Sequence, residues 1–219
     1  MKEEYKILND MGYTNDKIDT LLSLGYTIKD ILKINRKTNI IATYSNKSII
    51  DKFNYLLSLG FSKIETISIT TICPQIYCYK QNSIKTKIDS LMSLGYTYEE
   101  VKIMIINYPA ILNTSLEYIK EKIEFYNSIG LHNVLIKDTS HLITSLSLVY
   151  ARYMFLKEKD ITIDEKSYRK LFMRSKQFQK KYNISSEELI NKYPYKTNKK
   201  RVPNSRITKP EEETMSTKY

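Results

Sequence analysis

The glycines of this chain recur at a fixed spacing. Four of the five, Gly25, Gly60, Gly95 and Gly130, lie 35 residues apart, and the fifth, Gly12, stands in the same local context. A fixed period of about 20–50 residues is typical of stacked supersecondary units, and this one falls in the range of helical-hairpin repeats. The spacing therefore predicts an all-α fold, a curved α-solenoid built from a 35-residue unit.

The unit around Gly95 indicates how each repeat folds. Apolar residues in 84–94 follow a helical spacing, which predicts a helix that ends at the glycine. Glycine suits the left-handed conformation of a helix C′ position because it has no Cβ atom. Thr97 and Glu100 have the pattern of a capping box for a second helix, which the Tyr-Pro pair at 108–109 ends. Each unit is therefore predicted to be a helix, a glycine turn, a second helix and a proline-containing connector.

The ends of the array depart from this pattern. The last unit shortens the register by about five residues, and the segment around Gly12 has the features of a truncated cap, as terminal repeats often do. A strongly basic amphipathic helix is predicted over 164–182 with Asp164 as its N-cap, and Ser185 starts a further short helix. The expected organisation is a solenoid over 1–160, a C-terminal helical extension over 161–194 and a disordered basic and acidic tail over 195–219.

Residues 94–131, LGYTYEEVKIMIINYPAILNTSLEYIKEKIEFYNSIGL, resemble the repeat of the mitochondrial transcription termination factor (mTERF) family. That family repeats a Leu-Gly turn, a helix, a proline followed by Leu or Ile, and a helix ending in another Leu-Gly. The resemblance covers residues 8–156. It implies a curved solenoid with a short third helical turn at each proline, and nucleic-acid binding in transcription, ribosomal RNA maturation or translation. The N-terminus, MKEEYKILND, lacks the features of a transit peptide, so we expect a short cytoplasmic or bacterial-type member.

The charge of the chain is unevenly distributed. The formal net charge is +11, with 17 Lys/Arg and 15 Asp/Glu in residues 1–140 but 18 and 9 in residues 141–219. This asymmetry favours an acidic partner, most commonly nucleic acid, although an AT-rich genome would also enrich lysine. No apolar run approaches the ~18–20 residues that span a bilayer, so no membrane partner is expected.

One candidate contact surface is a repeated cation eight residues before each glycine, extended to the last unit by aligning its aromatic residues. Its members are Lys17, Lys52, Lys87, Lys122 and Arg152. A ladder of cations would match the regular spacing of a phosphate backbone. Equally, each stem could cover the core while its charge reaches water, which is a structural role. Both interpretations stay open.

The second candidate surface is the polar side of the helix predicted over 164–182. Its members are Lys166, Arg169, Lys170, Arg174, Lys176, Lys180 and Lys181. The aromatic face of the same helix is expected to pack on the solenoid. Basic amphipathic helices also dock on membranes or in partner grooves, and nucleic acid is favoured here because the solenoid indicates the same ligand.

Residue patterns of enzymes are absent from the sequence. The glycines are all used as helix caps, and neither His132 and His141 nor Cys73 and Cys78 have the spacing of a triad or metal site. We therefore expect no enzymatic activity, metal or cofactor. The alternative function is a protein-interaction scaffold, which predicts an exposed apolar or aromatic patch along the concave face. DNA or RNA, a protein partner and the oligomeric state remain open.

Overall fold

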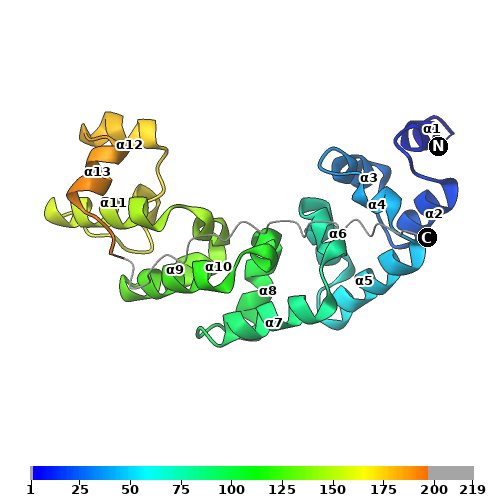
Figure 1. Ribbon diagram of the computed structural model, residues 1–219, viewed down its shortest axis with the longest axis horizontal. Coiled ribbons are helices and arrows are strands. Elements are labelled where there is room, and N and C mark those ends of the chain that lie inside the picture. The colour runs from blue at the N-terminus through cyan, green and yellow to red at the C-terminus, as the bar shows by residue number, and fades with distance from the viewer. Residues whose placement is uncertain (1, 197–219) are drawn as a thin grey trace, which may run out of the picture.

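A computed structural model describes residues 2–196, which form an arc of helices (Figure 1). All regular elements of this part of the chain are helical, which confirms the predicted all-α solenoid. With η marking a 3-10 turn, the elements are α1 (Lys2–Asp10), α2 (Asn15–Ser23), α3 (Ile28–Asn35), α4 (Ile40–Thr43), α5 (Asn46–Ser58), α6 (Lys63–Ile72), η1 (Pro74–Cys78), α7 (Gln81–Met92), α8 (Tyr98–Asn107), η2 (Pro109–Asn113), α9 (Leu116–Ser128), α10 (His132–Lys137), η3 (Thr139–Ile143), α11 (Leu146–Glu158), η4 (Tyr168–Lys170), α12 (Ser175–Tyr182) and α13 (Ser186–Lys192).

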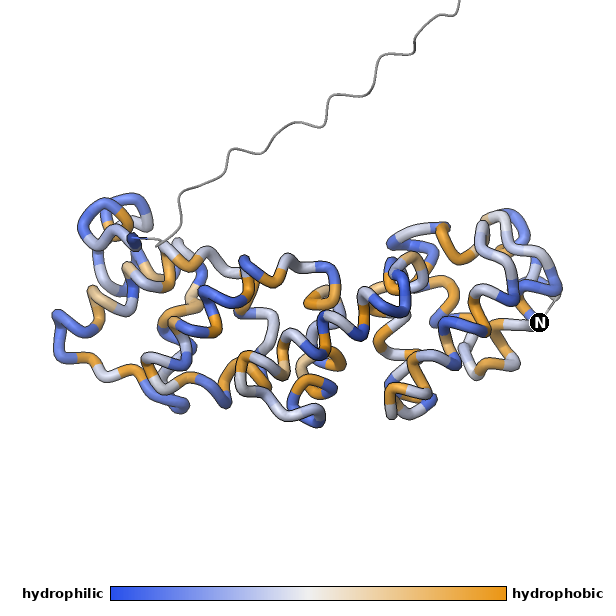
Figure 2. The backbone as a smooth tube through the Cα atoms, turned by 60° about the horizontal axis from the view of Figure 1, so that its bottom comes forward, coloured by the Kyte–Doolittle hydropathy of each residue, from blue (hydrophilic) through white to orange (hydrophobic). Residues whose placement is uncertain are grey.

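The helices lie in two rows along the arc. Helices α5, α7 and α9 follow its outer side, and α3, α6 and α8 follow its inner side (Figure 1). Neighbouring inner helices pack on one another, α3 on α6, α6 on α8 and α8 on α10. Apolar and polar positions alternate along the whole tube (Figure 2), so the core runs along the arc and has no single centre.

The turn between the two helices of a hairpin has the backbone that the glycine pattern predicts. Gly60 has a φ of +74°, and the N–H of Phe61 donates to the carbonyl of Leu56, five residues back. This bond is typical of the motif that ends a helix at a left-handed residue. The capping box predicted for Thr97 with Glu100 forms, and the structure has the same arrangement at Thr27 with Asp30, Ser62 with Glu65 and Ser185 with Glu188.

The same turn continues beyond the last glycine. Asp160 and Asn183 have φ values of 55° and 53° at the ends of α11 and α12. Asp and Asn are the residues that adopt this conformation most readily after glycine. At the first of these turns the N–H of Ile161 donates to the carbonyl of Leu156 over 2.9 Å, as in the glycine turns. The hairpin geometry therefore extends into the C-terminal segment.

The connectors contain the short helical turn that the resemblance implies. Pro74 and Pro109 begin η1 and η2 and are buried, whereas the first connector uses α4 and has no proline. The last glycine unit is shortened in its second helix, because α10 has six residues where α8 has ten.

The continuous basic helix predicted over 164–182 is wrong. This segment forms η4, a turn and the separate helix α12, and the backbone of Arg174 between them is extended (φ −57°, ψ 140°). The guanidinium of Arg152 donates hydrogen bonds to the carbonyls of Leu171 and Met173. These two bonds hold the backbone here in a non-helical conformation. Of the tail predicted over 195–219, residues 197–219 lie outside the described part of the chain.

Candidate nucleic-acid interface

The repeated cations face the connector of their own unit. Each lies on the first helix of a hairpin and donates to a main-chain carbonyl at the end of the connector. The pairs are Lys17 with Tyr44, Lys52 with Tyr79, Lys87 with Thr114, Lys122 with Leu142 and Arg152 with Leu171. The donor and acceptor are 27 residues apart in the first three pairs, and 20 and 19 in the shortened units. We call each of these contacts a connector brace.

The brace answers a local electrostatic need. Tyr44, Tyr79 and Thr114 are the extended residues that follow the short helical turns, so their carbonyls lie outside the hydrogen bonding of the turn. Each carbonyl oxygen needs a donor and carries a partial negative charge. A cation placed there satisfies both. The side chains of these cations are mostly buried: Lys17 is 6% exposed, Lys52 8%, Lys122 2% and Arg152 1%, and Lys87 is half-buried.

Burial affects the protonation of the brace lysines. Desolvation lowers the pKa of Lys122 from 10.5 to about 8, and its Nζ lies 3.8 Å from the centroid of the Tyr118 ring. Desolvation also lowers the pKa of Lys87, and the carboxylate of Glu117 partly opposes that shift.

The structure thus brings the five cations to one repeated position, as the sequence predicts, but turns them into the molecule. Their donors are directed at carbonyls and their side chains are largely covered, so they do not form an exposed row. Contact of Lys17, Lys52, Lys87, Lys122 and Arg152 with nucleic acid stays a prediction, and this geometry favours the structural interpretation.

The shifted pKa of Lys122 predicts a pH dependence of stability. Unfolded chains keep this proton up to about pH 10.5, whereas the folded chain releases it near pH 8. Between those values the unfolded state binds more protons, so the free energy of unfolding rises with pH, by at most about 1.4 kcal/mol per pH unit. We expect wild type to gain stability relative to Lys122→Met from about pH 8 to 10, as measured by urea denaturation. Buried tyrosines titrate in both proteins and cancel; a difference independent of pH would contradict the assignment.

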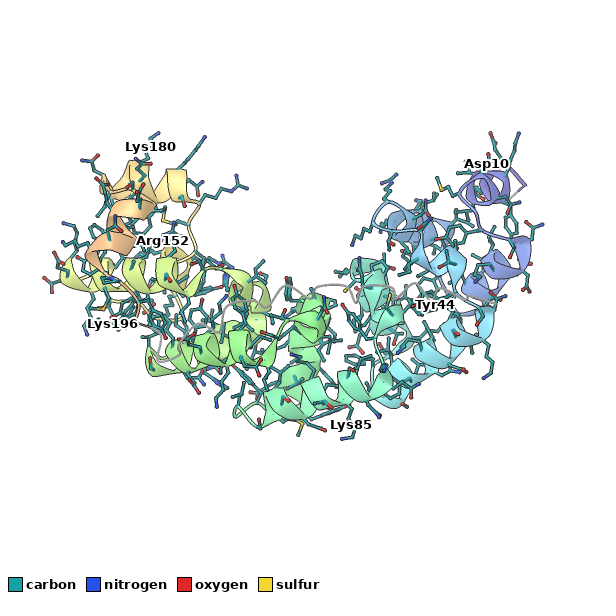
Figure 3. The ribbon with its side chains drawn as sticks, viewed as in Figure 1. Asp10, Tyr44, Lys85, Arg152, Lys180 and Lys196 are labelled. Carbon is teal, nitrogen blue, oxygen red and sulfur yellow. The ribbon has the colours of Figure 1, made fainter. Side chains whose placement is uncertain are left out.

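The second candidate set forms an exposed group at the C-terminal end of the arc. We call Lys166, Arg169, Lys170, Arg174, Lys176, Lys180 and Lys181 the C-terminal basic cluster; all are exposed except Lys170, which is half-buried. Lys180 lies at the tip of this end (Figure 3). Residues 2–196 hold 29 Lys/Arg and 21 Asp/Glu, and 161–196 hold nine and four, so this end carries +5 of an excess of +8. Among the described residues, Arg169 is the only cluster member in an ion pair, with Asp138 at 4.0 Å.

Aromatic packing fixes the cluster on the solenoid. Phe178 of α12 is 1% exposed, and its ring centroid lies 6.0 Å from that of Phe155 on α11. The guanidinium of Arg152 lies 4.7 Å from the Phe178 centroid and donates to the carbonyls of Leu171 (2.8 Å) and Met173 (2.7 Å). The aromatic face therefore belongs to the core, as predicted, although two short elements form it.

Sequence reasoning missed a feature of the inner side, the groove between α3 and α6. Ile64 is 80% exposed there and Ile72 is 48% exposed, while Lys33 and Arg36 line the opposite side. Helix α6 has isoleucines on both of its faces. Because both faces are apolar, the sequence could not indicate which isoleucines pack in the core and which are left uncovered.

The described residues show no other chemical site. In residues 2–196 no group of three or more His, Cys, Asp or Glu side chains is placed to hold a metal ion. Within the same range no helix is long and apolar enough to cross a bilayer. His141 is stacked on Phe172 with ring centroids 3.6 Å apart, which is a packing role in the junction with the C-terminal segment.

The braced hairpins, left-handed turns and 3-10 connectors define this protein as a helical-repeat α-solenoid. The chain belongs to the mTERF family, whose family model matches residues 3–180. Members of this family are nucleic-acid-binding helical-repeat proteins and are not known as enzymes. The match includes the solenoid and most of the C-terminal basic cluster. No curated protein shows significant sequence similarity to the chain.

Proposed function

We propose that this protein binds the phosphate backbone of DNA or structured RNA through its C-terminal basic cluster, with the braced solenoid as a rigid support. The observation that carries the proposal is the concentration of exposed cations at one end of a fold whose family binds nucleic acid. Exposed cations can pair with phosphates and release counterions, whereas the buried brace cations already have acceptors. In keeping with the family, the process served would be transcription or the maturation or use of ribosomal RNA.

The test compares two charge reversals of equal size. Lys176→Glu/Lys180→Glu/Lys181→Glu changes three exposed cluster residues on α12. The matched control, Lys47→Glu/Lys85→Glu/Lys120→Glu, changes exposed lysines on the outer helices, each of which pairs with a carboxylate four residues on. Both triple variants lower the formal net charge from +11 to +5.

We expect the cluster variant to lose about 100-fold or more in affinity and to show a shallower salt dependence, because each lost phosphate contact removes about one counterion from the slope. The control should stay within about fivefold of wild type. Fluorescence anisotropy with a labelled duplex DNA and a labelled RNA hairpin, over a range of salt concentrations, measures both and separates the two ligands. Equal losses in the two variants would contradict the proposed site, and salt-independent or absent binding by wild type would contradict the function.

A second candidate function is a protein-interaction scaffold. The observation that favours it is a set of three exposed isoleucines on the inner helices. Ile64 and Ile72 on α6 are 80% and 48% exposed, and Ile103 on α8 is 44% exposed. An apolar inner surface is suited to a protein partner and contributes little to phosphate binding. Absence of nucleic-acid binding in the experiment above would favour this function.

A further inference from the structure

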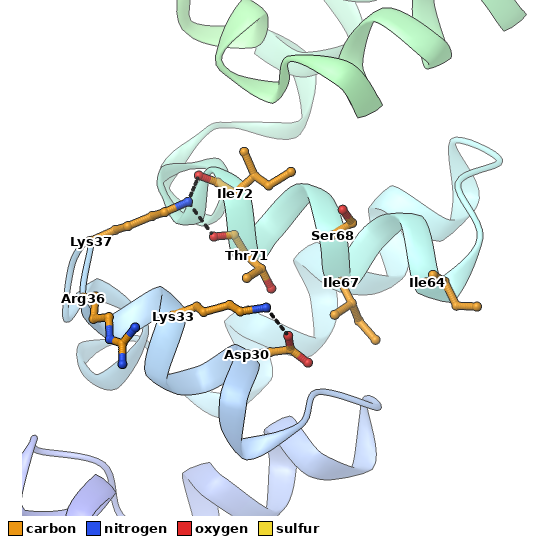
Figure 4. A pocket seen from close by; sticks show the side chains of 9 residues that line it. All are labelled: Asp30, Lys33, Arg36, Lys37, Ile64, Ile67, Ser68, Thr71 and Ile72. Atoms are coloured by element: carbon orange, nitrogen blue, oxygen red, sulfur yellow. Dashed lines mark hydrogen bonds and ion pairs between the residues drawn. The ribbon is translucent and has the colours of Figure 1, made fainter.

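The groove between α3 and α6 combines an apolar wall with a basic one. It is a hollow of about 500 Å³ on the inner side of the arc (Figure 4). The apolar wall is formed by Ile64, Ile67 and Ile72 of α6. The basic wall is formed by Lys33 of α3 and by Arg36, the residue that follows α3. Lys33 lies 3.9 Å from Asp30, a weak pair because its side chain is 61% exposed. Such a groove suits a helix with apolar residues on one face and acidic residues beside them.

Helix α1 of the same chain has that chemistry. It forms the N-terminal end of the arc, with Asp10 near the tip (Figures 1 and 3). Its inner face is held by Leu8, which is fully buried. Ile7 and Met11, on the side of the helix next to Leu8, are 44% and 39% exposed, and the exposed acids Glu3 and Asp10 lie along that side at helical spacing, with the exposed Lys6 beside them.

The position of α1 is fixed by its contacts. Besides Leu8, the Tyr5 hydroxyl donates to Asp19 of α2 over 2.6 Å. These contacts keep the acidic and apolar face turned outward, where the described part of the chain does not cover it. This face is therefore free to pack on a surface of matching chemistry outside the chain.

We propose that the chain self-associates head to tail, with α1 of one copy packed in the α3–α6 groove of another. Ile7 and Met11 would contact the isoleucines of α6, while Glu3 and Asp10 would meet Lys33 and Arg36. The helix and the groove are different surfaces, so the contact is heterologous and can propagate from copy to copy. A contact made by one short helix is small, and we expect dissociation constants of about 10–100 µM.

Charge exchange between the two surfaces tests the contact. In one variant, Glu3→Lys/Asp10→Lys makes α1 basic; in the other, Lys33→Glu/Arg36→Glu makes the groove acidic. Each variant alone repels itself at every contact. In a mixture, the basic α1 fits the acidic groove and the native α1 fits the native groove, so the two kinds of copy can alternate. All substituted side chains are exposed, which limits their effect on folding.

Sedimentation equilibrium of the nuclease-treated full chain is the measurement. We expect wild type to associate, each variant alone to bind itself at least tenfold more weakly, and the equimolar mixture to recover association to within about threefold of wild type. The control Lys47→Glu/Lys85→Glu has the same charge change as the groove variant, on the outer side, and should associate like wild type.

Three results would overturn the proposal: a monomeric wild type at about 500 µM, variants that associate as wild type does, or a mixture that stays monomeric. If circular dichroism shows that a charge variant is unfolded, Ile64→Ser replaces it, since this side chain is 80% exposed and its loss should still weaken association. The C-terminal basic cluster is intact in all these proteins. Failure of self-association and failure of nucleic-acid binding are therefore separate outcomes.

Discussion

Lys122→Glu is expected to lower the free energy of unfolding by about 3–5 kcal/mol, the usual consequence of breaking a buried charged contact. The substitution places a carboxylate against the Leu142 carbonyl, which now accepts from the Lys122 ammonium over 2.5 Å. The side chain is 2% exposed, so neither group can recover full hydration. Domains of this size are stable by about 5–15 kcal/mol, so this loss is a large fraction of the total free energy of unfolding. The variant should therefore unfold at a clearly lower temperature than wild type.

The matched control is Lys120→Glu on the same helix. The side chain of Lys120 is 54% exposed and pairs with Glu124 at 3.8 Å, so its reversal should change stability by no more than about 1 kcal/mol. Urea denaturation followed by circular dichroism measures both variants. If Lys122→Glu kept wild-type stability and instead lost affinity for nucleic acid, the brace would have no structural role and the ladder interpretation would be correct.

Arg152→Leu is expected to release the C-terminal segment from α11 and to lower stability by about 3–4 kcal/mol. The guanidinium donates to the Leu171 and Met173 carbonyls and to Ser175 Oγ at 3.4 Å, and its Cζ atom lies over the ring of Phe178. Leucine replaces the apolar volume but none of the donors. Because these contacts hold η4 and α12 in place, affinity for nucleic acid should fall as well, although Arg152 itself is buried.

Two further substitutions separate the causes. Arg152→Lys keeps the charge but offers no planar fork, so we expect it to retain about half of the stabilisation. Arg169→Leu removes an arginine of the C-terminal basic cluster whose side chain is 81% exposed, and stability should change by less than about 1 kcal/mol. Hydrogen exchange of residues 168–182 gives the local readout. Unchanged protection of this segment in Arg152→Leu would show that the packing of Phe178 alone holds it.

The repeat and its local signals could be predicted from the sequence because they depend on neighbouring residues. Glycine at the C′ position, the capping boxes and the proline connectors each act within a few residues, and each is found where expected. The left-handed turns at Asp160 and Asn183 were not predicted, because the sequence pattern for such a turn was defined by glycine alone. Asp and Asn two residues before a Thr or Ser could have indicated them.

The direction of the brace cations could not be predicted in the same way. In the sequence, a lysine beside an apolar stripe gives the same pattern whether its amine reaches water or a main-chain carbonyl. Lys52, for example, reaches the carbonyl of Tyr79, 27 residues along the chain. Only the packed position of the connector decides between them. The break before α12 has the same origin, because the hydrogen bonds from Arg152 that hold Leu171 and Met173 come from a distant helix.

The connector brace also bears on how such an array can change over time. Its acceptor is a main-chain oxygen, which every amino acid supplies, and Tyr44, Tyr79, Thr114 and Leu142 all serve. Drift in the connector side chains therefore leaves the brace intact as long as one cation and the backbone path survive. The brace from Lys122 to Leu142 spans 20 residues where that from Lys52 to Tyr79 spans 27, and it forms on the same terms. A unit of this kind can be exchanged, shortened or given a new inner surface while one side chain still ties its connector to its first helix.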